Sequence, residues 1–356
     1  MRLLTLTLCL VPTLGVAQSR FTPEEARILQ KGLTVTAEEF ILPAYRAQEE
    51  AAARLTSALG AYCGGDGALD EVRDGYADLF LAWQRAGLVK LGPVTEAEGP
   101  MRVQLWPDPK GFSRRAVLAA RNDEDPAMLE EGALEGRSIA LVNLTALEDL
   151  VQSDLTPGSY YCDLARAIAD YQDDLAQGFV DEWTPGAPFR DAFDSASDGN
   201  DTYGSVDDLI REFLSGLVVS TDRIRKNKIA RGLGAEPGET YPERTEAVAI
   251  GLGLESIRAS FSGLADLYEV PGGFFQMTPE AGGLMDHYMH GQTARSVAET
   301  LQGETRSLVE IAEADGEMAA TLRRYGELLV FQEAYLKAGL AESLGLTAGF
   351  SAADGD

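Results

Sequence analysis

Histidine and cysteine are scarce in this chain. Its 356 residues include 2 histidines and 3 cysteines. Serine or cysteine nucleophiles are usually activated by an adjacent base, which here would have to be one of the two histidines. The sequence also has no Gly-x-Ser-x-Gly motif, which is typical of serine hydrolases of the α/β class. The sequence therefore gives little support to nucleophilic hydrolases of these kinds.

Positive charge is scarce as well. The chain has 30 Lys and Arg against 57 Asp and Glu, a formal net charge of -27 at pH 7. Nucleic-acid-binding surfaces need clustered Lys and Arg, because these displace counterions from the phosphates. No basic run is present, so we expect no nucleic-acid partner. Such an acidic balance is typical of a charged, solvated surface and could also attract cations.

Long apolar runs are missing except at the start of the chain. An apolar run extends from Leu3 to Leu14 and is followed by the small residues Gly15 and Ala17. This pattern predicts a secretory signal peptide, residues 1–17, cleaved after Ala17. No later segment has the roughly 20 apolar residues that a transmembrane helix needs. We therefore expect a mature protein of the periplasm or cell envelope without a transmembrane segment.

Two cysteines, Cys63 and Cys162, remain after removal of the signal peptide. An exported protein reaches a compartment that permits disulfides. A bridge closing a loop of about 100 residues would contribute about 4.7 kcal/mol in the chain-entropy model. We predict that the two cysteines pair.

Most of the remaining chain has the pattern of α-helices. Apolar residues recur at three- and four-residue spacing, and alternating strand patterns bounded by turn pairs are absent. Pro43 should kink or interrupt the first helix, because proline removes a backbone donor. The helices expected from this pattern cover residues 33–63, 68–91, 159–183, 206–231, 242–267, 279–301 and 304–344, with further helices beginning at Ser113 and Leu134.

We expect a domain boundary near the middle of the chain, where Pro, Gly and Ser are concentrated in residues 184–204. The number of helices and the lengths of their connections are typical of antiparallel bundles. We predict an all-α fold of two antiparallel helical-bundle domains. Residues 18–185 form the N-terminal bundle and residues 186–356 the C-terminal one.

The two histidines, His287 and His290, lie three residues apart in a predicted helix, beside Asp286. Histidines at this spacing can share a metal ion. Helices of zinc hydrolases, however, present two histidines four residues apart with a glutamate between them, and the sequence His-Tyr-Met-His lacks both features. Exposed or packing histidines are the alternative interpretation.

An unexpected carboxylate occurs in the stretch "LVNLTALEDLV", Leu141–Val151. The spacing predicts one amphipathic helix in which Glu148 lies on the apolar face. A buried carboxylate is costly unless it is paired or hydrogen-bonded, so Glu148 should have a partner. Candidate partners are Arg102, Tyr45, Tyr160 and Tyr161.

Three alternatives remain open for Glu148. It could form a buried ion pair that fixes a loop between helices. It could line a ligand or metal pocket together with Thr145, Arg102, Trp106 and Asp108. It could also be a solvated residue at the edge of the apolar stripe.

Several short stretches resemble one known family in their order and position. They are "FILPAY" from Phe40, "KLGPV" from Lys90, "RVQLWPD" from Arg102, "LTALEDL", "YYCDLARAIAD" and the terminal "LGLTAGFSAADGD". This order resembles the imelysin-like family, also called the peptidase M75-like or iron-regulated protein A group. The resemblance implies an all-helical protein of two bundles, exported to the periplasm or held at the outer membrane. It also implies a link to iron uptake, and founding members of the family were described as metallopeptidases.

The family signature is Gly-x-His-x-x-Glu, whose His and Glu were proposed to bind metal or assist hydrolysis. Laid onto this sequence, the signature places its Glu at Glu148, its His at Thr145 and its Gly at Asn143. A neutral hydroxyl is a poor ligand for zinc or iron compared with an imidazole. One carboxylate cannot complete a three-ligand catalytic zinc site unless distant residues supply the rest.

We therefore predict a non-catalytic protein that binds a small ligand or a metal ion. The alternatives are a metallopeptidase-type hydrolase that uses Glu148 and an envelope scaffold that binds a protein partner.

The terminal Asp-Gly-Asp is another family feature and holds Asp354 and Asp356. Phe350 could anchor this tail against a bundle. Carboxylate ligands suit calcium or iron(III) better than zinc. If a metal binds, we predict Glu148, Asp354 and Asp356 as its ligands in preference to the imidazoles.

Overall fold

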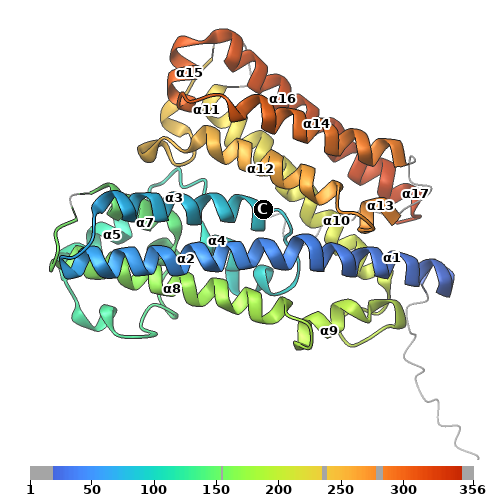
Figure 1. Ribbon diagram of the computed structural model, residues 1–356, viewed down its shortest axis with the longest axis horizontal. Coiled ribbons are helices and arrows are strands. Elements are labelled where there is room, and N and C mark those ends of the chain that lie inside the picture. Colours follow the sequence, from blue (N-terminus) through green and yellow to red (C-terminus); the bar gives the residue numbers. More distant parts are fainter. Residues whose placement is uncertain (1–18, 154, 235–238, 278–283, 347–356) are drawn as a thin grey trace, which may run out of the picture.

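The computed structural model describes residues 19–153, 155–234, 239–277 and 284–346. Helices dominate these residues and no β-strand occurs among them, so the predicted all-α fold is confirmed. Figure 1 shows two layers of helices, the N-terminal half (blue to green) packed against the C-terminal half (yellow to red). No helix in the described part of the chain is long and apolar enough to cross a membrane. The predicted signal peptide lies outside the described residues.

The N-terminal half is a bundle built around α2, which packs against both α3 and α8. Large aromatic side chains lie in its core, where each buries a large apolar area and so contributes strongly to stability. Tyr45 and Trp183 are both fully buried and stack with ring centroids 6.4 Å apart. The helices of this half are α1 (Pro23–Thr36), α2 (Leu42–Gly64), α3 (Leu69–Ala86), α4 (Gly99–Val103), α5 (Phe112–Asp123), α6 (Ile139–Val142), α7 (Leu144–Gln152) and α8 (Tyr160–Trp183).

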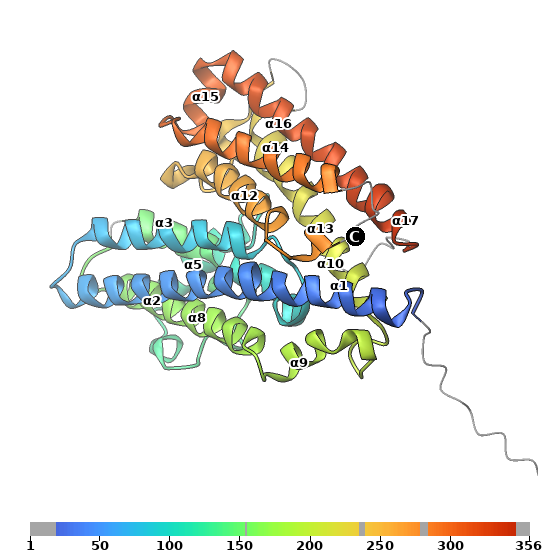
Figure 2. The same ribbon diagram turned by 45° about the vertical axis from the view of Figure 1, so that its right-hand side comes forward.

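Pro43 does interrupt the hydrogen-bonding pattern of the first helix, as predicted, yet the helix runs on. The turn before it, η1 (Ala37–Ile41), is π-helical, and Pro43 occupies the first turn of α2. A proline within a helix clashes with the carbonyl four residues earlier, and widening that turn relieves the clash. As a result α1 and α2 form one long rod, visible in blue in both views (Figures 1 and 2).

The C-terminal half packs α12 against α14, and α10 against α16. It meets the N-terminal half where α12 packs on α3 and where α13 packs on α1 (Figures 1 and 2). Between the halves in sequence, α9 (Pro188–Asp194) packs against α1 and α8 of the N-terminal half. The helices of the C-terminal half are α10 (Val206–Arg223), the π-helical η5 (Ile224–Ala230), α11 (Arg231–Leu233), α12 (Gly253–Tyr268), α13 (Phe274–Met277), α14 (Leu284–Gln302), α15 (Leu308–Ala314), α16 (Gly316–Ala334), the π-helical η8 (Tyr335–Leu340) and α17 (Ala341–Ser343).

Several of the predicted helices are shorter than expected: the helix predicted over 68–91 ends at Ala86, and the one predicted from Leu134 begins at Ile139. The segment 242–267 becomes α-helical only at Gly253, after the 3-10 turns η6 (Pro242–Arg244) and η7 (Val248–Ile250). Its backbone adopts positive φ at Ala247 and Gly251, which an α-helix does not allow. The segment 304–344 is broken at Asp315, whose side chain accepts a hydrogen bond from the Met318 N–H and so caps α16.

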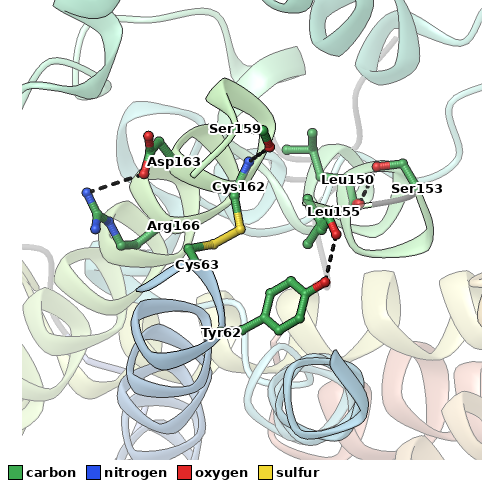
Figure 3. Close-up of a disulfide and its surroundings, with 9 residues drawn as sticks. All are labelled: Tyr62, Cys63, Leu150, Ser153, Leu155, Ser159, Cys162, Asp163 and Arg166. Carbon is green, nitrogen blue, oxygen red and sulfur yellow. Dashed lines mark hydrogen bonds and ion pairs between the residues drawn. A yellow bond between two sulfur atoms is a disulfide. The ribbon is translucent and has the colours of Figure 1, made fainter. Parts of the chain in front are cut away.

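The predicted disulfide is confirmed. Cys63, at the end of α2, is bonded to Cys162, in the first turn of α8 (Figure 3). Beside the bridge, the Tyr62 hydroxyl donates to the Leu155 carbonyl at 2.7 Å. The two cysteines are 99 residues apart in the sequence, and the bond joins the ends of two adjacent helices. It therefore limits how far these helices can separate in the unfolded chain.

Candidate functional site

The stretch "LVNLTALEDLV" forms two helices, so the prediction of a single helix is wrong. Asn143 ends α6 and caps α7. Its Oδ1 accepts hydrogen bonds from the backbone N–H groups of Thr145 and Ala146, at 2.7 and 3.2 Å. These two hydrogen bonds satisfy backbone N–H groups that have no partner within the first turn of a helix. An Asn side chain that caps in this way favours the start of a new helix over continuation of the preceding one.

Thr145 holds the loop that carries Trp106. Its hydroxyl donates to the Leu105 carbonyl at 3.1 Å. The preceding residue, Gln104, is buried and tied to the other half of the protein. Its Nε2 donates to Glu246 at 2.9 Å, and its Oε1 accepts from Arg223 at 2.9 Å. Hydrogen bonds from both halves of the protein therefore fix the loop before Trp106, and the Thr145 hydroxyl is occupied by its bond to the backbone of that loop.

Glu148 lies half-buried where α7 meets η7 of the C-terminal half. It accepts a hydrogen bond from the Ala249 N–H. Burial raises the pKa of Glu148 to about 7, and the nearby carboxylates of Glu246 and Asp149 add to the rise. Tyr76 is close enough that the charges of Glu148 and Glu246 raise its pKa, after a larger effect of burial. Glu148 is therefore a carboxyl group that titrates near neutral pH at the junction of the two halves.

The partners predicted for Glu148 bind elsewhere, so that prediction is wrong. Arg102 donates to the Tyr171 hydroxyl at 3.1 Å and makes no ion pair with Glu148, both residues being described. The remaining candidates are engaged as follows: Tyr45 donates to the Val89 carbonyl, Tyr160 donates to the Asp125 carbonyl, and the ring of Tyr161 lies under the Arg121 guanidinium. Glu148 accepts a backbone N–H instead, and because burial disfavours its charged form, its raised pKa lets it remain protonated up to about pH 7.

A buried charged network lies next to Glu148, and no sequence motif predicts it. Glu246 is 1% exposed and Lys228 is 4% exposed, and the two form an ion pair. The Lys228 ammonium also donates to Gln84 of α3 and Ser256 of α12. Burial lowers the pKa of Lys228 to about 8 against the opposing effect of Glu246. Burial acts to raise the pKa of Glu246, but the cations Lys228 and Arg223 outweigh it and hold the pKa below its usual value. This network fastens α3, η5 and α12 together at the junction.

Trp106 and Asp108 line a cavity of about 770 Å³ with residues of the C-terminal half. Asp108 accepts hydrogen bonds from the Phe112 and Ser113 N–H groups, both at 2.8 Å, and thus holds the start of α5. The C-terminal half contributes Arg231 and Tyr241 to the lining. Of the five residues predicted to share a pocket, the structure places these two in one cavity, whereas Glu148, Thr145 and Arg102 do not line it.

Of the other predicted metal ligands, His290 is the one whose side chain the structure describes. The His290 ring packs between Tyr268 and Tyr335, at centroid distances of 6.1 and 4.6 Å. The side chain of His287, in α14, and the terminal Asp354 and Asp356 lie outside the described residues. Within the described part of the chain, no group of three or more His, Cys, Asp or Glu side chains is arranged to hold a metal ion. The described donors therefore do not fit the catalytic metal that the family signature implies.

Comparisons with known proteins agree with this architecture. An imelysin-like protein from Psychrobacter arcticus 273-4, known from its crystal structure, superposes with a TM-score of 0.74. The match covers 93% of this chain and 99% of that chain at 17% sequence identity, which establishes likeness of fold. A comparison with proteins of curated function gave no significant match. The family model of imelysin, peptidase M75, matches residues 41–332. Because that match covers most of the sequence, the chain belongs to the imelysin family.

Proposed function

We propose that this protein is an exported, non-catalytic binding protein of the periplasm or cell envelope, with its ligand site at the junction of the two halves. The observation that carries the proposal is the cavity of about 770 Å³ that both halves line. Its volume falls within the range of about 300 to 1,000 Å³ that is usual for small-molecule sites. Thr145, which holds the loop of Trp106 through the Leu105 carbonyl, has a positioning role in this proposal. The link to iron uptake rests on the family alone.

The competing hydrolase function would use Glu148. A carboxyl group whose pKa is about 7 lies in the range suited to a general base, which favours this alternative. Against it, the position expected for a metal-binding imidazole is Thr145, and its hydroxyl is engaged by the Leu105 carbonyl. A protein-degradation assay on wild type and Glu148→Gln decides between them. We expect both proteins to be inert, and cleavage by the wild type that is lost in Glu148→Gln would replace our proposal with the peptidase.

The binding function is tested on protein purified from the envelope of its own host under non-denaturing conditions. Native mass spectrometry should show a bound mass that is released on unfolding. Elemental analysis of the same sample tests the metal alternative, and calorimetric titrations with calcium, iron and zinc extend it. Protein that carries neither a small molecule nor a metal, and that instead co-purifies in a fixed ratio with another envelope protein, would favour the scaffold function.

Export is tested separately. Cell fractionation should place the full-length protein in the envelope fraction, with a mature sequence that begins at Gln18. Removing residues 1–17 should retain it in the cytoplasm. A full-length protein that stays cytoplasmic with Met1 in place would contradict the predicted signal peptide.

A further inference from the structure

The cavity at the junction has walls of different character. The N-terminal half contributes Trp106, Asp108 and Pro109, and the C-terminal half contributes Arg231, Tyr241 and Arg244. Trp106, Pro109 and Tyr241 provide apolar surface, while the two arginines provide positive charge. Such a combination of apolar walls and a few polar groups is typical of a site that orients a small organic molecule.

Most charges in this cavity already have partners within the protein. Asp108 holds the start of α5 through the N–H groups of Phe112 and Ser113. Lys226 pairs with Asp222 at 2.9 Å. Arg244 pairs with Glu243 at 3.4 Å, and its guanidinium lies 4.1 Å from the centroid of the Tyr241 ring. These groups are therefore less available to a ligand than an unpaired charge would be.

Among the described cations that line the cavity, Arg231 is the exception. It makes no hydrogen bond or ion pair with any residue that the structure describes, although acidic residues outnumber basic ones by 57 to 30. Its guanidinium lies 5.7 Å from the centroid of the Trp106 ring. The Arg231 Nε and the Trp106 Nε1 are both buried N–H donors without a hydrogen-bond partner among the described residues. Those two atoms are out of reach of solvent, but Arg231 as a whole is only half-buried and lines the cavity, so its unpaired positive charge is available to a ligand there.

We propose that Arg231 binds the carboxylate of a small monoanionic organic ligand whose apolar body packs against Trp106 and Tyr241. The planar guanidinium presents parallel donors that match the geometry of a carboxylate. A dianionic phosphate fits less well, because Glu239 and Glu243 line the same cavity and would repel a second negative charge. This inference rests on the proposed binding function and adds the chemistry of the ligand and the residue that anchors it.

Sodium benzoate is a suitable probe, because it combines one carboxylate with a flat apolar ring. Binding can be followed by tryptophan fluorescence. The chain has three tryptophans. Trp83 and Trp183 are 2% and 0% exposed, and neither lines this cavity, whereas Trp106 does. A saturable change in fluorescence that disappears in Trp106→Phe therefore reports on the cavity. Benzyl alcohol serves as the neutral analogue, benzylamine as the cationic one and inorganic phosphate as the dianion.

We expect the wild type to bind benzoate at least about tenfold more tightly than benzyl alcohol or benzylamine, because neither analogue offers a carboxylate for a charge-assisted hydrogen bond. Phosphate should also bind at least about tenfold more weakly, because it lacks the apolar ring and its second charge is repelled by Glu239 and Glu243. Arg231→Gln should weaken benzoate binding by about tenfold or more. Arg54→Gln removes the same charge from an exposed site on α2 and should leave binding unchanged. If Arg231→Gln does not fold, Arg231→Lys keeps the charge but loses the planar fork, and it should bind at least about fivefold more weakly than wild type.

The inference is overturned if benzoate does not bind, if the arginine variants that fold bind it as tightly as wild type, or if phosphate binds better. Binding of benzyl alcohol or benzylamine in preference to benzoate, reported by Trp106, would overturn the carboxylate assignment and leave the binding function intact. If none of the four probes binds and native mass spectrometry also finds no ligand, both proposals fail together.

Discussion

Replacing Glu148 by glutamine should remove a pH-dependent loss of stability from this protein. The Glu148 carboxyl group is half-buried at the junction, accepts a hydrogen bond from the Ala249 N–H, and has its pKa raised from 4.5 to about 7, mainly by burial. Glutamine has nearly the same shape, still accepts from that N–H through its carbonyl oxygen, and carries no charge at any pH. The substitution therefore changes the ionisation of this side chain and little else.

The sign and size of the effect follow from the two pKa values. Between pH 4.5 and about pH 7 the unfolded chain has released the Glu148 proton while the native protein still holds it. Stability therefore falls as pH rises through this window and levels off above it. At about 1.4 kcal/mol per pKa unit, the native state loses about 3 kcal/mol by pH 8. Glu148→Gln should lack this contribution.

Urea unfolding followed by far-ultraviolet circular dichroism measures the free energy of unfolding at pH 5 and pH 8. Asp173 has its pKa raised to about 6, and burial also raises the pKa of Asp149 and of Glu212, so the difference between variant and wild type is the quantity to compare. We expect the variant to gain about 2 to 3 kcal/mol relative to wild type between the two pH values. Glu50→Gln, on an exposed part of α2, should show no such change. A constant difference between Glu148→Gln and wild type would refute the reasoning from burial.

Three further predictions concern stability. Replacing both Cys63 and Cys162 by alanine should lower the free energy of unfolding by up to about 4.7 kcal/mol, measured by urea unfolding, and an unchanged midpoint would contradict the role of the 99-residue loop. Thr145→Val, which keeps the shape but removes the hydroxyl, should cost about 1 kcal/mol in the same assay, and no loss would show that its hydrogen bond is not formed. Lys228→Met should cost about 3 to 5 kcal/mol because it leaves Glu246 charged and buried, and the double variant that also carries Glu246→Gln should recover part of this loss; equal costs in single and double variants would argue against the ion pair.

Local sequence patterns accounted for much of the fold because an α-helix is a local structure. The three- and four-residue spacing of apolar side chains fixes which face of each helix is buried, and neighbouring residues supply the caps. The predicted helix boundaries are wrong where a single side chain ends one helix and caps the next. Asn143 splits the predicted helix of the signature region by capping α7, and Asp315 does the same at α16. An Asn or Asp in a helical pattern can be either an interior residue or a cap, and periodicity does not distinguish them.

The candidate site was less predictable, because its residues come from separate parts of the chain. The sequence marks Trp106 and Asp108 as candidates, but their cavity partner Arg231 lies more than a hundred residues later and carries no motif. It also marks Glu148 as an unusual carboxylate, whereas the backbone N–H that Glu148 uses and the neighbouring Glu246 belong to the other half of the protein. Sequence spacing holds no information about which surfaces of two bundles meet.

The sequence by itself determined the helical class, the position of most helices and the pairing of Cys63 with Cys162, because spacing, composition and the number of cysteines leave few alternatives. Only the tertiary structure decided what surrounds each charged side chain. It placed Glu148 against Ala249 and Glu246 and buried Lys228 in a network across three helical segments. It also left Arg231, beside Trp106, with no hydrogen bond or ion pair to any described residue. The pKa and the binding capacity of a side chain depend on its solvation and its neighbours within a few ångströms, and these are set by packing between segments distant in sequence.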